Sequence, residues 1–174
     1  SEQVNVSYDE GRTSDALTLK GNESYVETPV ENLGINSTIE FWVKRDANST
    51  DEEQILFESD KGAIKAVQKE TGKLGFSRDW HDYSFNYELP KGEWVKIKLD
   101  TALTVTKLYV NDELVDTLGI NATGGKWASL VIPLNRIGST EKAFQGQIDD
   151  VIVEKKVAEC TATATSEQSQ DKAA

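Results

Sequence analysis

The segment Arg78-Asp79-Trp80-His81-Asp82-Tyr83 places, in six consecutive positions, the side chains with which proteins hold sugars. An aromatic ring stacks on the apolar face of a sugar, while carboxylate, guanidinium and imidazole groups bond its hydroxyls. The segment falls between two expected strands, which predicts a loop or hairpin tip, where an exposed tryptophan needs a reason. We therefore predict ligand binding by Arg78, Asp79, Trp80, His81, Asp82 and Tyr83. In the alternative interpretation, Trp80 folds back over the sheet and the charged groups are only solvated.

The other tryptophans fall into two kinds. Trp127 follows Gly124-Gly125-Lys126 and predicts a second loop aromatic, which we add to the ligand-binding residues. Trp42 and Trp94 lie inside strand-like segments and alternate with clearly apolar positions, so they line the second face of a sheet. There they are either packing residues covered by loops or part of an open ligand groove.

The carboxylates do not predict catalysis. Glycoside hydrolysis needs two carboxylates that flank the bond, and two positions of a strand share a face only when they alternate. The pairs Glu52-Glu53 and Asp149-Asp150 are adjacent, so in a strand their side chains point to opposite faces. A serine nucleophile would need a histidine base, and the single histidine, His81, has no glycine elbow beside it. We expect a domain that is not an enzyme.

The segments that position these residues repeat with a period of two, the pattern of half-buried strands. Apolar residues alternate with others in segments 39–44, 95–99 and 108–111. Turn residues separate such segments, and Asn111-Asp112 is typical of a two-residue hairpin. No long stretch carries a helical stripe. The pattern predicts an all-β fold, a two-sheet antiparallel jelly-roll sandwich.

Composition excludes several partners and sites. Of 174 residues, 19 are Lys or Arg and 30 are Asp or Glu, which gives a formal net charge of −11. This balance argues against nucleic acid and against anionic membrane surfaces, because both reward clustered cations. No apolar run is long enough for membrane insertion as a helix. One cysteine, Cys160, and one histidine exclude an intrachain disulfide and any metal site with several such ligands.

The ends of the chain differ from its middle. The sequence begins at Ser1 and contains no Met, so we expect a piece cut from a longer, processed chain. Residues 1–11 predict a lead-in strand or linker, and 12–157 the jelly-roll domain. Residues 158–174 are small and polar and predict a disordered tail or linker.

The order of the strand motifs resembles the laminin-G-like branch of the concanavalin A-like lectin/glucanase superfamily over about residues 14–156. The motifs that carry this resemblance are Leu17 to Pro29 with its Gly21 loop and Tyr25-Val26-Glu27, Ile39-Glu40-Phe41-Trp42-Val43-Lys44, Gly72-Lys73-Leu74-Gly75-Phe76, Gly92-Glu93-Trp94-Val95-Lys96, Lys107-Leu108-Tyr109-Val110-Asn111-Asp112-Glu113-Leu114, Arg136-Ile137-Gly138 and Phe144-Gln145-Gly146-Gln147-Ile148-Asp149-Asp150-Val151. The chain departs from the family at Asp112, where glycine is usual.

A narrower likeness rests on residues 54–89, with Ile55-Leu56-Phe57-Glu58 and Leu74-Gly75-Phe76-Ser77-Arg78. These residues look like the modules appended to secreted bacterial glycoside hydrolases, notably family 20 β-N-acetylhexosaminidases and lacto-N-biosidases. The likeness implies a non-catalytic carbohydrate-binding or accessory module, with a glycan and an attached catalytic domain as partners. It also implies a secreted or cell-surface location, and we expect a monomer. A structural spacer and a protein-binding adhesion module are the alternatives.

The resemblance also implies a structural Ca²⁺ ion, which many members hold between an early loop and the final strand. The matching residues here are Asp149, Asn22 and Glu23, whose oxygen atoms are ligands that Ca²⁺ prefers. Both faces of the final strand are apolar, so the sequence leaves open whether Asp149 or Asp150 points inward. Alternatively, backbone N–H groups satisfy the inward carboxylate.

Overall fold

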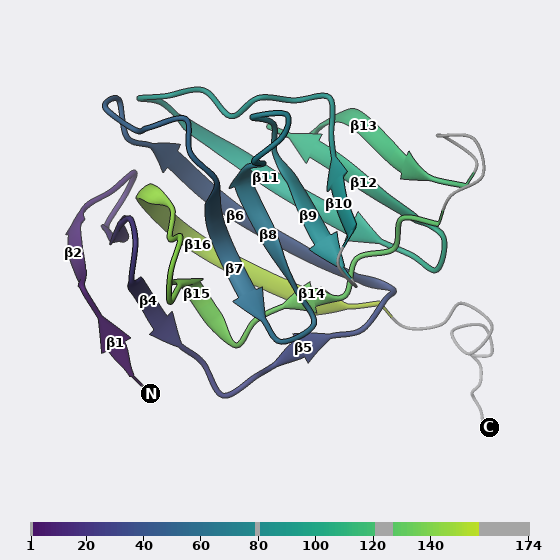
Figure 1. Cartoon of the computed structure of the whole chain (residues 1–174), viewed down its shortest axis with the longest axis horizontal. Coiled ribbons are helices and arrows are strands. Elements are labelled where there is room, and N and C mark those ends of the chain that lie inside the picture. Colours follow the sequence, from purple (N-terminus) through teal and green to yellow (C-terminus); the bar gives the residue numbers. More distant parts are fainter. Residues whose placement is uncertain (1, 79–80, 121–126, 157–174) are drawn as a thin grey trace, which may run out of the picture.

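The computed structural model describes residues 2–78, 81–120 and 127–156, and its regular elements in these ranges are all β-strands. Figure 1 shows two large sheets that lie face to face, one in front of the other. The strand pairs within them are antiparallel, so the predicted two-sheet jelly-roll sandwich is confirmed. No helix in the described ranges has the length and apolar character to cross a membrane.

Each large sheet has seven strands in the described part of the chain. The front sheet of Figure 1 runs in the order β1 (Gln3–Val4), β4 (Ser24–Glu27), β15 (Arg136–Ser139), β7 (Gln54–Ser59), β8 (Gly62–Val67), β9 (Gly75–Arg78) and β10 (His81–Ser84). The back sheet runs β13 (Glu113–Gly119), β12 (Val105–Val110), β11 (Trp94–Thr101), β6 (Ser37–Arg45), β16 (Gln145–Lys155), β3 (Asp15–Lys20) and β2 (Val6–Glu10). A third sheet pairs β14 (Ile132–Pro133) with β5 (Asn32–Leu33). Residues 3–4 and 6–10 therefore form strands, β1 paired with β4 and β2 paired with β3.

The hydrophobic core fills the space between the two sheets. Ile39, Phe41 and Val43 of β6 point into it and are completely buried, whereas Trp42 between them is only half-buried on the outer face. The ring of Phe41 meets that of Phe57 from the front sheet edge-on, with 5.0 Å between centroids. The period-two prediction for this strand is confirmed, and it fixes which side chains remain outside to form a site.

Two local features depend on left-handed backbone. Asn111 and Asp112 have φ angles of 50° and 73°, and the hairpin they close pairs Val110 with Glu113. Asn and Asp tolerate this conformation better than other residues with a side chain, so the predicted hairpin is confirmed. Asp150 also has a positive φ of 51° and lies in a β-bulge of β16.

The pairing of β16 with β6 shows where the two aspartates of β16 point. Ile148 lies opposite Val43 and is buried, so the next residue, Asp149, falls on the outer face of the back sheet. The extra residue at the bulge shifts the register, and Val153 then lies opposite the core residue Ile39. Neither aspartate points into the core.

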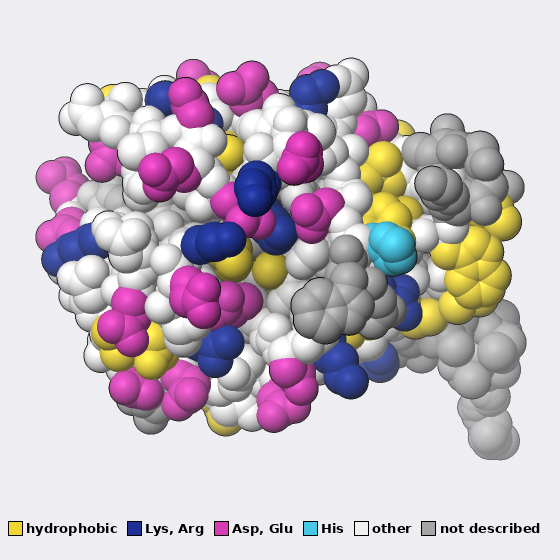
Figure 2. Space-filling model, viewed as in Figure 1, with side chains coloured by type: hydrophobic (Ala, Val, Ile, Leu, Met, Phe, Trp, Pro, Cys, Tyr) yellow, Lys and Arg dark blue, Asp and Glu magenta, His cyan; other side chains and the backbone are white. Residues whose placement is uncertain are grey.

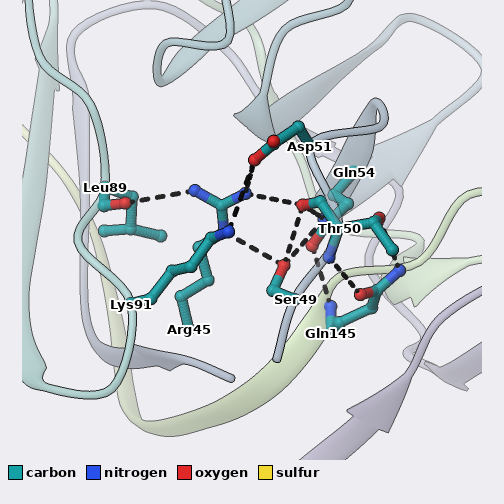
Figure 3. A network of polar contacts seen from close by, with 8 residues as sticks. All are labelled: Arg45, Ser49, Thr50, Asp51, Gln54, Leu89, Lys91 and Gln145. Atoms are coloured by element: carbon teal, nitrogen blue, oxygen red, sulfur yellow. Dashed lines mark hydrogen bonds and ion pairs between the residues drawn. The ribbon is translucent and has the colours of Figure 1, made fainter. Parts of the chain in front are cut away.

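A buried guanidinium fixes the connection between β6 and β7 (Figure 3). The side chain of Arg45 is 2% exposed and donates hydrogen bonds to Ser49 Oγ, the Thr50 carbonyl and the Leu89 carbonyl, at 3.0, 2.7 and 3.3 Å. Gln54 donates to the same Ser49 hydroxyl and Thr50 carbonyl. Because a guanidinium has five N–H donors in a rigid plane, Arg45 holds three segments in one arrangement.

Candidate functional site

A groove of about 590 Å³ opens on the outer face of the front sheet. Its walls come from β7, β8, β9 and β10 and from residues 136–142. Figure 2 looks onto this face and shows Lys and Arg (dark blue) and Asp and Glu (magenta) gathered at its centre, with apolar surface (yellow) between them. Five acidic and four basic side chains line the groove: Glu53, Glu58, Asp60, Asp82 and Glu141 with Lys61, Lys65, Arg136 and Lys142.

Lys65 is the central cation of the groove. Its side chain is only 10% exposed, and its Nζ lies 2.6 Å from Glu53 Oε2 and 3.1 Å from Asp82 Oδ1. On β8, Ile64 and Ala66 point into the core, so Lys65 between them must point outward into the groove. An ammonium group has three N–H donors, and the described residues take up two of them.

Glu53 joins Lys65 to a second lysine. Lys142 Nζ lies 2.8 Å from Glu53 Oε1, so the carboxylate bridges two ammonium groups. Burial alone would raise the pKa of Glu53, but the hydrogen bonds from Lys142 and Lys65 together outweigh it and hold that pKa below its ordinary value. The same hydrogen bond raises the pKa of Lys142. The Glu53 carboxylate is therefore charged throughout the neutral range.

A second carboxylate is held at the opposite wall of the groove. Glu58 accepts hydrogen bonds from Arg136 Nε at 2.6 Å, Ser139 Oγ at 3.0 Å and the Thr140 backbone N–H at 3.0 Å. Residues of β15 and Thr140 just after it fix this side chain, because β15 pairs directly with β7 at Arg136 and Glu58. The groove thus contains fixed charge pairs rather than freely moving surface charges.

The structure separates the residues of the predicted 78–83 site. Asp82 lines the groove and is bonded to Lys65. Its neighbours behave differently, since His81 is exposed and the ring of Tyr83 stacks on Phe76 with 5.0 Å between centroids. Tyr83 thereby packs against the core cluster instead of presenting a free ring. Asp79 and Trp80 lie outside the described residues.

Arg78 and Trp127, predicted from distant parts of the sequence, are brought to the same end of the sandwich. Arg78 Nη1 donates to the Ser129 carbonyl at 2.9 Å and also to the Ser129 hydroxyl. Trp127 is two residues before Ser129 and is 55% exposed. The end of β9 is therefore bonded to the segment that carries Trp127, a link that the sequence spacing alone does not reveal.

Trp42 and Trp94 lie on the outer face of the back sheet, as their alternation with core residues predicts. The guanidinium of Arg12 lies 3.6 Å from the Trp42 ring centroid and also forms an ion pair with Asp150 at 3.3 Å. This cation–π contact covers one face of the indole. The geometry fits the packing interpretation of Trp42 better than an open ligand platform.

The predicted calcium ligands are not brought together. Gln145 lies opposite Lys20, beside the turn that contains Asn22 and Glu23, whereas Asp149 is four residues farther along β16. At the rise of a strand this separation is about 13 Å, too far for one ion. In the described ranges, no three His, Cys, Asp or Glu side chains gather as a metal site requires. Asp149 Oδ1 accepts a hydrogen bond from the Asp150 N–H, while its buried Oδ2 has no partner in the described part of the chain.

The central residues of the groove were not predicted from the sequence: Glu53, Lys65 and Lys142, with Glu58 and Arg136 at the wall. One signal was available, since Lys65 interrupts the apolar run 63–67. A lysine in such a run indicates an outer-face position that needs partners. The partners themselves come from other segments and carry no such signal.

The comparisons with known proteins agree with this fold. A family model described as "Concanavalin A-like lectin/glucanases superfamily" matches residues 20–159, so the chain belongs to this superfamily of lectin-like domains. The comparison with curated proteins finds no match.

Among solved structures, domain 4 of AbnA, a GH43 extracellular arabinanase from Geobacillus stearothermophilus in complex with arabinotriose, is similar with a TM-score of 0.62 and 18% identity, covering 88% of this chain and 77% of that chain. The carbohydrate-binding module CBM66 from Bacillus subtilis has a TM-score of 0.51 and 12% identity, covering 88% and 94%. The binding domain of botulinum neurotoxin serotype D has a TM-score of 0.55 and 17% identity, covering 88% of this chain and 42% of that chain. These likenesses show a shared fold.

Proposed function

We propose that this chain is a non-catalytic carbohydrate-binding module whose glycan lies in the groove of the front sheet. The observation that carries the proposal is the Glu53–Lys65–Asp82 cluster, a nearly buried ammonium held between two carboxylates on the floor of an open groove. Buried ion pairs contribute little net stability, so a fixed, polar constellation in a groove is better explained by recognition. A few convergent polar groups over apolar surface are the general form of a small-molecule site.

The proposed context is an accessory module of a secreted glycoside hydrolase. The arabinotriose complex of the AbnA domain and the name of CBM66 support a glycan as the ligand. The extracellular arabinanase supports a secreted or surface location and an attached catalytic domain. The narrower likeness to family 20 enzymes stays a prediction. A dissociation constant of about 10–1000 µM is expected, because one or two sugars bury little area, and tethering would raise the local substrate concentration.

A glycan array with the wild-type chain and Lys65→Met tests the proposal. Methionine keeps most of the volume of the lysine stem and removes its N–H donors. We expect wild-type binding to at least one glycan class and a loss of about tenfold in affinity in the variant. Lys61→Met is the matched control, because Lys61 lines the same groove but is exposed.

The outcomes separate the proposal from its alternatives. Loss of the glycan signal in Lys65→Met but not in Lys61→Met supports binding in the groove. Absence of any glycan signal with the wild-type chain favours a structural spacer. Binding to proteins but to no glycan favours an adhesion module.

A further inference from the structure

The cations of the groove are already neutralised by carboxylates of the same chain. Lys65 lies between Glu53 and Asp82, and Lys142 shares Glu53 with it. At the wall, Arg136 Nε lies 2.6 Å from Glu58 Oε2. Lys61 is the remaining cation of the lining, and it is exposed at the rim. An acidic sugar would therefore find no unpaired cation on the groove floor among the described residues.

The charge around the groove also disfavours an anion. The lining has one more acidic than basic side chain, and the whole chain carries a formal net charge of −11. The carboxylate of a uronic or sialic acid placed beside Lys65 would lie next to the like charges of Glu53 and Asp82. Within a groove this repulsion is screened by solvent less than at an open surface.

The same atoms suit a neutral sugar. Lys65 keeps one N–H donor, and the carboxylate of Asp82, 43% exposed, keeps free acceptor positions. A hydroxyl group both donates and accepts, so one hydroxyl can accept from Lys65 while its neighbour donates to Asp82. Ile55 and Ala63 add apolar surface to the lining, against which C–H groups of a sugar ring can pack.

We propose that the groove selects uncharged sugars through a pair of adjacent hydroxyls, with Lys65 as donor and Asp82 as acceptor, and that it rejects sugars that carry a carboxylate. This inference rests on the proposed glycan-binding function and adds the substrate class to it. Selectivity lies in the pairing of Lys65 with two carboxylates, which leaves the ammonium able to donate but without net attraction for an anion.

The test compares matched pairs of neutral oligosaccharides and their uronic- or sialic-acid-containing counterparts on wild-type chain. We expect the neutral member to bind at least about tenfold more tightly. The affinity for the neutral oligosaccharide should change by less than about twofold between low and high NaCl concentration, because an uncharged ligand has no net charge for salt to screen. Preference for the acidic member, or equal affinity for both, overturns the inference and leaves glycan binding intact. Absence of binding to every glycan overturns both proposals.

The variant Asp82→Asn tests the assignment of residues. The amide keeps an oxygen that can accept from Lys65, but it removes one negative charge beside the ammonium. We expect affinity for the acidic counterparts to rise about fivefold and to become salt-dependent. Asp60→Asn is the matched control, because it removes the same charge from an exposed residue of the groove lining. Equal effects of the two variants would assign selectivity to net charge alone and overturn the role of the Lys65–Asp82 pair.

Discussion

Arg45 and Lys65 are both buried cations, yet their partners differ in kind. Arg45 donates mainly to the Ser49 hydroxyl and the Thr50 carbonyl of the loop that follows β6 and to the carbonyl of Leu89. Lys65 donates to two carboxylates on the floor of an open groove. The carbonyls around Arg45 are fixed parts of the chain, while the carboxylates around Lys65 keep acceptor positions open to the groove.

This difference separates an architectural network from a recognition site. The Asp51 carboxylate lies 3.5 Å from Arg45 Nη2 but is 88% exposed, so it adds little to the stability of the loop. The backbone bonds of Arg45 carry the structural role. Burial of a charge is therefore not informative by itself, and the chemical nature and accessibility of its partners decide its role.

The largest expected effect is on stability at the architectural network. Arg45→Met leaves the Leu89 carbonyl without its donor and removes the guanidinium that links the Ser49 hydroxyl and the Thr50 carbonyl to it, so the free energy of unfolding should fall by about 3 kcal/mol. Urea denaturation measures this change. Lys91→Met is the control, because Lys91 contacts only the exposed Asp51 within the network, and a loss of under about 0.5 kcal/mol is expected. Similar losses in both variants would contradict the comparison.

Lys65→Met should behave in the opposite way. Removing the ammonium leaves Glu53 paired with Lys142 and leaves Asp82 partly exposed, so the free energy of unfolding should change by no more than about 1 kcal/mol. The loss of glycan affinity in the same variant would then come from the site rather than from the fold. A loss of stability as large as that of Arg45→Met would show that Lys65 is also architectural.

Acid should weaken the groove network. The pKa of Glu53 is lowered in the folded chain, so its contribution is present above the ordinary glutamate pKa and is lost as the pH falls below about 4, through the folded pKa. Glycan affinity and the free energy of unfolding should both decline in this window. In Glu53→Gln, glycan affinity and the free energy of unfolding should depend less on pH than in the wild-type chain. An unchanged pH dependence in this variant would assign the decline to other carboxylates.

The fold was predictable because the signals that specify it are local. Alternation in 39–44 separates core from surface within a few residues, and Asn111-Asp112 marks its own turn. The orientation of β16 was not predictable, because apolar residues alternate on both faces of its sequence. The pairing of Ile148 with Val43 and the bulge at Asp150 decide which side chains face the core.

The groove was not predictable because its residues meet through pairing across the sheet. Arg136 and Glu58 lie opposite one another although 78 residues separate them in sequence. Lys65 and Asp82 meet across β9, which lies between their strands. Register between distant strands depends on the assembled core, so the sequence provides candidates such as Asp82 without the partners that define the site.

Trp127→Ala should have a smaller effect, confined to binding. The indole is 55% exposed, so the free energy of unfolding should change by less than about 0.5 kcal/mol. If the ring stacks on a sugar at the end of the sandwich, glycan affinity should fall about fivefold. Leu103→Ala is a matched control, because Leu103 is equally exposed and lies next to Thr104, whose carbonyl accepts from the Ala128 N–H. Trp80→Ala tests the remaining sequence prediction in the same assay.

The smallest effect is expected for calcium, which should leave the melting temperature of the chain unchanged. Because Asp149 is separated from Asn22 and Glu23, the melting temperature should be the same in Ca²⁺ and in EDTA. Asp149→Asn keeps an oxygen that can accept from the Asp150 N–H and removes the negative charge beside the unpaired, buried Oδ2. The free energy of unfolding should therefore rise by about 0.5 kcal/mol in either buffer. If Asp149 instead binds a cation, Ca²⁺ would raise the wild-type melting temperature by mass action, and the same variant would abolish that rise.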